Sequence, residues 1–168
     1  WLNAILSTVI VNITRSIPFA ILMVALIPFA AMLIGTALGP IAASVSLTIG
    51  TIPFFARLVE TALRDVNSGK VDAALVMGST KLQTIRKVLV PEAMPGIISA
   101  VTTTMVTLIG YSAMAGLVGG GGLGRLAYNY GYVRYNMPIM LATIVIIVIM
   151  VQLVQVIGDA IARKVDHR

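Results

Sequence analysis

Three long stretches of this chain contain no acidic or basic side chain. They comprise residues 16–56, 93–124 and 135–158, and each lacks Lys, Arg, Asp, Glu and His. A helix needs about 20 residues to cross the roughly 30 Å of hydrocarbon in a bilayer, and every stretch is long enough. The whole chain is 58% hydrophobic and 11% charged, whereas soluble domains are roughly 45 to 50% apolar. The sequence therefore predicts an all-α protein that crosses a membrane several times.

The first uncharged stretch is long enough for two crossings. It is interrupted at residues 35–40 by Gly-Thr-Ala-Leu-Gly-Pro, a composition typical of a turn. We expect Pro28 and Pro53 to kink the helices that contain them, which membrane bundles tolerate. The sequence thus predicts one transmembrane domain, residues 1–168, with spans at about 9–34, 41–56, 96–118 and 137–158 and a polar loop at 57–92.

The distribution of basic residues predicts the orientation of these spans. When the 57–92 loop and the C-terminal tail lie on one side of the membrane, only Arg125 and Arg134 lie on the other. Because the side richer in Lys and Arg faces the cytoplasm, the loop and the C-terminus are expected to be cytoplasmic. The basic residues on that side are Arg15, Arg57, Arg64, Lys70, Lys81, Arg86, Lys87, Arg163, Lys164 and Arg168.

Charge and residue types also exclude several functions. The net charge of +6 comes from residues at the ends of apolar spans and not from one basic face, so no nucleic-acid partner is expected. The chain has no Cys, and His167 is its single His, so no metal site or resident cofactor is expected. The spans lack the carboxylate or His that an ion-coupled carrier or a membrane enzyme would use. Composition alone leaves a non-transporting scaffold open.

The polar loop carries its own helical pattern. Ala, Leu and Met predict a short helix at 71–77, Gly78 permits a bend, and Leu82, Ile85 and Leu89 recur at helical spacing before a break at Pro91. The small Ala73 and Ala74 would let the backbone of a partner approach closely. The pattern alone fits equally well a helix that rests on lipid headgroups.

The order of residues in this loop resembles a known family. Asp72-Ala73-Ala74, followed by Gly78, Val88 and Pro91, resembles the EAA loop of binding-protein-dependent ABC importer permeases. Asp72 replaces the usual Glu, and Val88 and Val90 replace the usual Ile and Leu. Further along, residues 110–116, 119–124 and 128–132, together with 15–19, look like the permeases of methionine importers.

The resemblance implies the type I transmembrane fold of ABC importers and a non-catalytic permease subunit. It implies a homodimer in a bacterial cytoplasmic membrane, with two ATPase subunits that bind ATP and Mg²⁺ and an extracytoplasmic substrate-binding lipoprotein. Members usually have five membrane helices per subunit, and the first of these is expected to be missing from the chain, which shows four. In the family this loop docks on the ATPase, which implies coupling roles for Asp72, Ala73, Ala74, Met77, Gly78 and Pro91.

A candidate substrate pathway follows one stripe of the third span. Thr103, Thr107, Tyr111 and Met114 lie at i, i+4, i+8 and i+11, and Ser112 is adjacent. A thioether and an aromatic ring suit the side chain of D- or L-methionine or a related amino acid, which the resemblance implies is moved by alternating access. Alternatively, these hydroxyls bond to carbonyls of their own helix and Met114 fills a packing gap.

The glycine-rich run from 119 to 124 is a weak phosphate-binding signal. Gly119, Gly121 and Gly124 fit G-x-G-x-x-G, but no strand is predicted before them, and Arg125 and Leu126 stand where a P-loop needs Lys and Ser or Thr. An external turn or gate is the expected role. The tyrosines that follow are expected to form an interfacial belt or to receive a binding protein; they are Tyr128, Tyr130, Tyr132 and Tyr135.

Overall fold

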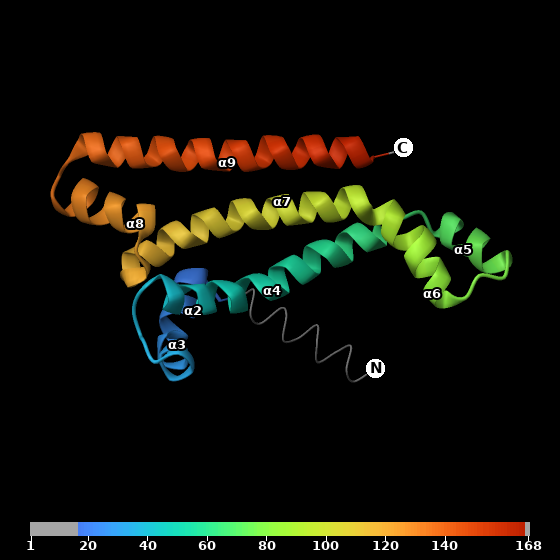
Figure 1. The fold of residues 1–168 in the computed structure, drawn as a ribbon, viewed down its shortest axis with the longest axis horizontal. Coiled ribbons are helices and arrows are strands. Elements are labelled where there is room, and N and C mark those ends of the chain that lie inside the picture. The colour runs from blue at the N-terminus through green and yellow to red at the C-terminus, as the bar shows by residue number, and fades with distance from the viewer. Residues whose placement is uncertain (1–16, 167–168) are drawn as a thin grey trace.

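Three long helices form the body of the protein. The computed structural model describes residues 17–166, and no strand occurs in that part of the chain. The long helices are α4 (Pro40–Arg64), α7 (Val90–Ala115) and α9 (Met137–Val165). Helix α7 lies in the middle and packs against α4 on one side and α9 on the other (Figure 1). The all-α membrane architecture predicted from the uncharged stretches is confirmed.

Short helical segments gather at the two ends of this body. Helices α5 and α6 lie at the same end as the C-terminus, whereas α2, α3 and α8 lie at the opposite end (Figure 1). The segments named η1 and η3 have the wider turns of a π-helix, whereas η2 is interrupted by non-helical backbone at Val118 and Gly119. In chain order the short elements are α2 (Phe19–Ala25), α3 (Ile27–Ile34), α5 (Ser68–Val76), α6 (Lys81–Thr84), η1 (Ile85–Leu89), η2 (Gly116–Gly120), α8 (Gly122–Leu126) and η3 (Ala127–Val133).

Within residues 17–166, three helical stretches are long and apolar enough to cross a membrane, and the second is kinked near its end, where Val118 and Gly119 leave helical backbone angles. They are Pro40–Arg64, Lys81–Gly120 and Met137–Val165, and they contain the predicted spans 41–56, 96–118 and 137–158. Within the predicted span 9–34, the described part consists of α2 and α3, which meet at Leu26. Residues 1–16, with Arg15, lie outside the described residues, as do His167 and Arg168.

The prolines behave differently from one another. Pro28 lies in the first turn of α3, directly after the interruption at Leu26, while Pro53 lies inside the continuous helix α4. Pro91 is the second residue of α7, and the helix runs through it from α6 and η1 without a break. The expected break at Pro91 is therefore wrong, because the wide turn of η1 accommodates a residue that has no N–H to donate.

Small residues allow the long helices to cross closely. A Cβ added to Gly158 of α9 would lie 2.0 Å from Thr102 Oγ1 of α7, and one added to Gly96 of α7 would lie 2.8 Å from Ala62 Cβ of α4. The Thr102 hydroxyl donates to the carbonyl of Ile98 one turn earlier, at 3.0 Å. Its polar group is thus satisfied within α7, so the side chain can be buried at the crossing.

Candidate functional site

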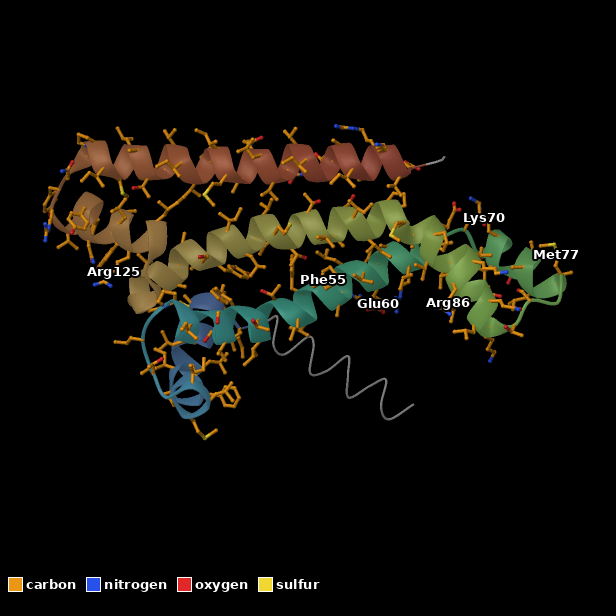
Figure 2. The ribbon with its side chains drawn as sticks, viewed as in Figure 1. Phe55, Glu60, Lys70, Met77, Arg86 and Arg125 are labelled. Carbon is orange, nitrogen blue, oxygen red and sulfur yellow. The ribbon has the colours of Figure 1, made fainter. Side chains whose placement is uncertain are left out.

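The α5–α6 loop, residues 65–89, extends beyond the ends of α4 and α7. Figure 2 shows Met77 at its far end and Arg125 at the opposite end of the molecule. Helix α5 begins at Asn67, whose side-chain Oδ1 accepts a hydrogen bond from the Gly69 N–H at 2.8 Å. This cap satisfies one of the free donors in the first turn and defines where the short helix starts.

A glycine in a left-handed conformation ends this helix. Gly78 has a φ of 83°, at the position where the sequence predicts a bend. No atom lies within 4 Å of a Cβ built on it, apart from its own chain neighbours. The requirement for glycine here comes from the backbone, because L residues with a side chain are disfavoured at positive φ.

Hydroxyl groups hold the turn between α5 and α6. Ser79 Oγ donates to the carbonyl of Ala74 at 2.7 Å and lies 2.7 Å from Thr84 Oγ1. Thr80 caps α6 through a reciprocal pair with Gln83, in which the Thr80 N–H donates to Gln83 Oε1 at 2.9 Å. We did not single out these residues from the sequence, although Thr80-x-x-Gln83 is a recognisable capping-box pattern. The turn has a defined shape, and α5 is held against α6.

The residues proposed to couple to an ATPase have unequal access to a partner. Asp72 and Ala73 are exposed, whereas Ala74 is only 5% exposed, so its methyl group is covered by this chain itself. Val76 and Met77 are 88% and 83% exposed. We call Leu75, Val76 and Met77 the apolar tip of the loop. Pro91 is exposed but lies back at the start of α7.

An ion pair connects this loop with a long helix. Lys70 Nζ, in the first turn of α5, donates to Glu92 Oε1, in the first turn of α7. Two other ion pairs lie within α4, where Glu60 accepts from Arg57 at 2.7 Å and pairs with Arg64 at 2.6 Å. Residues 70 and 92 are far apart in sequence, and no local pattern predicts that they meet.

The five candidate pathway residues do not gather around one cavity. The Tyr111 ring stacks on Phe19 of α2, with ring centroids 4.0 Å apart and planes inclined by 5°. Thr107 Oγ1 donates to the carbonyl of Thr103 at 2.8 Å, so that hydroxyl is satisfied within its own helix. Ser112 lines a cavity of about 350 Å³ between α7, α8 and α9. Met114 is 39% exposed and lines another, of about 440 Å³, with η3 and α9.

A groove between α4 and α7 contains hydroxyls that we did not single out from the sequence. Its volume is about 450 Å³, and Ser44, Thr48 and Thr51 of α4 line it together with Thr104 of α7. The Thr51 Oγ1 atom is buried and has no hydrogen-bond partner among residues 17–166. Residues 44, 48 and 51 recur at helical spacing, so a search for polar stripes on α4 could have found them.

At the opposite end, the glycine-rich segment packs too closely for side chains. A Cβ on Gly124 would lie 1.9 Å from the carbonyl oxygen of Ala113, and one on Gly116 would lie 2.5 Å from the backbone nitrogen of Arg125. The Gly39 N–H donates to the carbonyl of Gly119 at 3.2 Å and joins this segment to the turn before α4. The glycines thus allow close backbone packing at this end of the bundle, whereas the expected role as a flexible external turn or gate stays a prediction.

Comparisons with known proteins were made for the whole chain. A family model described as the binding-protein-dependent transport system inner membrane component matches residues 1–168. A Vibrio cholerae protein named "Probable D-methionine transport system permease protein MetI" is 58% identical over 95% of this chain and 71% of its own length. The Bacillus subtilis "Methionine import system permease protein MetP" is 48% identical over 100% of this chain and 77% of its own length.

A solved structure has the same fold. It is described as an inward-facing conformation of the MetNI methionine ABC transporter, and it is 51% identical to this chain with a TM-score of 0.91. The match covers 95% of this chain and 74% of the solved one.

Proposed function

The chain belongs to the family of binding-protein-dependent transport system inner membrane components, and on that premise we propose that it is the membrane-spanning subunit of an ATP-driven methionine importer. The identities of 58% and 48% to permeases named for methionine support this substrate. Family membership displaces the non-transporting scaffold that composition left open. It also displaces the other alternative, an ion-coupled amino-acid carrier, for which the spans lack a carboxylate or His.

We infer that a partner ATPase binds the α5–α6 loop. The observation that carries this inference is the apolar tip, where Val76 and Met77 are 88% and 83% exposed beyond the end of the bundle. Exposed apolar surface is stabilised by about 25 cal/mol for each Å² that a partner covers. Asp72 and Ala73, also exposed, would lie beside the contact, and the bend at Gly78 would set the direction of the tip.

The expected mechanism is alternating access powered from outside this chain. ATP and Mg²⁺ would be bound by two ATPase subunits, whose closure moves the loops of a permease homodimer. A pathway on the two-fold axis then opens toward an extracytoplasmic binding protein. In this arrangement the loop and the C-terminus are cytoplasmic, in agreement with the basic residues on that side.

We propose that Met114 contacts the substrate and that Tyr111 supports the wall of the pathway. Met114 is 39% exposed beside a cavity, and its thioether offers a soft, polarisable contact to a methionine side chain. Tyr111 is held by stacking on Phe19, so its ring has a fixed position. Thr103, Thr107 and Ser112 are weaker candidates, since the Thr107 hydroxyl already bonds to its own helix.

The test is methionine uptake by the reconstituted complex. The permease is co-purified with its ATPase and placed in proteoliposomes with ATP inside and the binding protein outside. We expect labelled methionine to accumulate only with ATP and to stop when the ATPase carries an inactivating substitution. Uptake driven by an ion gradient without ATP, or a permease that co-purifies with no ATPase, would contradict the proposal.

A further inference from the structure

The covalent route from α5 to α7 contains two segments that can bend. It passes through the left-handed residue Gly78 and the short helix α6, and then through η1 (Ile85–Leu89). The wider turns of a π-helix interrupt the regular α-helical hydrogen bonds and are frequent at functional sites. Pro91 follows two residues after the end of η1 and has no N–H to donate to the preceding turn. A displacement of α5 would thus be partly absorbed before it reached α7.

The Lys70–Glu92 ion pair bypasses this route. Lys70 is the third residue of α5 and Glu92 the third residue of α7, so the pair joins the start of the loop helix directly to the start of the long helix. The side chains are 51% and 24% exposed. The pair spans two elements, unlike the Arg57–Glu60 and Arg64–Glu60 pairs of α4.

The start of α7 is in turn packed against the end of α4. Gly96 lies one helical turn after Glu92, and a Cβ at Gly96 would lie 2.8 Å from Ala62 Cβ. Ala62 is itself buried. Helices packed this closely move together, because a small shift of either would produce overlap. A force that reaches Glu92 would therefore act on α4 and α7 as one body.

We propose that the Lys70–Glu92 pair is a positioning contact that transmits movement of α5 to α7 and α4. The proposal rests on the proposed function, because it assumes that a partner moves the α5–α6 loop. A partly exposed ion pair contributes little to folding stability, so its loss leaves the fold intact. It does remove a direct connection across η1, so that more of a displacement of α5 is absorbed before it reaches α7.

The experiment exchanges the charges in the reconstituted complex and measures methionine transported per ATP hydrolysed. Lys70→Glu and Glu92→Lys are made singly and together. We expect each single variant to assemble and to hydrolyse ATP, with the transport ratio lowered about two- to fivefold, as for a partly exposed pair. The double exchange restores the pair and should recover the ratio. Glu60→Gln, which removes ion pairs confined to α4, is the matched control and should leave the ratio unchanged.

Two results would overturn the proposal. One is a wild-type transport ratio in both single variants. The other is a double exchange that remains as impaired as the singles, since that result assigns each residue a separate structural role. If a charge reversal prevents assembly of the complex, the milder variants Lys70→Met and Glu92→Gln are used instead. They should lower the amount of methionine transported per ATP by the same factor. Absence of ATP-dependent uptake by the wild-type complex would instead refute the proposed function, so the two failures are distinguishable.

Discussion

Substitution of Gly78 tests whether the backbone of the α5–α6 loop determines coupling. Gly78 has a φ of 83°, and nothing within 4 Å would meet a Cβ there. The cost of a substitution is therefore conformational, about 1–2 kcal/mol for an ordinary L residue. That cost lowers the population of the native turn about five- to thirtyfold relative to its alternatives.

Because the cost is one of backbone conformation, transport should fall step by step across a series of substitutions at Gly78. Asn tolerates the left-handed region and should retain most transport, Ala should lose part of it, and the β-branched Val should lose most. Uptake in proteoliposomes and the ATPase rate are measured for each variant, with thermal unfolding of the complex as the control for folding. If Asn is as defective as Val, side-chain bulk and not backbone conformation is responsible, and the reasoning is refuted. Normal transport by the Val variant would refute it as well.

The remaining predictions concern the long helices. Gly158→Val should lower the free energy of unfolding by about 1–3 kcal/mol, because its side chain would overlap with Thr102 at the α7–α9 crossing. Gly110→Ala, at a position with open space, is the control. If the two variants were equally stable to heat, the close packing at Gly158 would be contradicted. Met114→Ala should slow methionine uptake about two- to tenfold without dissociating the complex, and unchanged kinetics across several amino acids would remove Met114 from the pathway. Thr51→Val should raise the free energy of unfolding by about 1–3 kcal/mol, because Thr51 Oγ1 is buried without a partner in the described part of the chain. A lower free energy of unfolding would show that the hydroxyl has a hydrogen-bond partner in the assembled protein.

The order of apolar and charged residues along the sequence predicted those parts of the fold that depend on local composition alone. The charge-free stretches identified α4, α7 and α9, because hydrocarbon excludes charges along a whole helix. The bend at Gly78 was predictable for a similar reason, since its cause lies in one residue. Pro91 shows the limit of such rules: Pro usually ends a helix, but the wide turn of η1 lets the helix continue.

Contacts between distant residues were not predictable from a single sequence. The stacking of Tyr111 on Phe19 depends on how α2 packs against α7, and the Lys70–Glu92 pair depends on how the loop folds back. Ala74 illustrates the same limit, since the motif suggested contact with a partner whereas this chain itself buries the residue. Residue type and spacing show which residues share a helix face. Whether a partner can reach that face depends on how the neighbouring helices pack.

The central claim is that an ATPase subunit binds the apolar tip of the α5–α6 loop. The chain has no Cys, so Met77→Cys introduces a single thiol for site-specific cross-linking in the purified complex. Met32→Cys, at a 78% exposed position of α3 at the opposite end of the molecule, is the matched control. We predict that a short cross-linker joins residue 77 to the ATPase with a yield that changes on addition of ATP, and that residue 32 gives no such product. Cross-linking of the ATPase through residue 32 and not through residue 77 would contradict the claim.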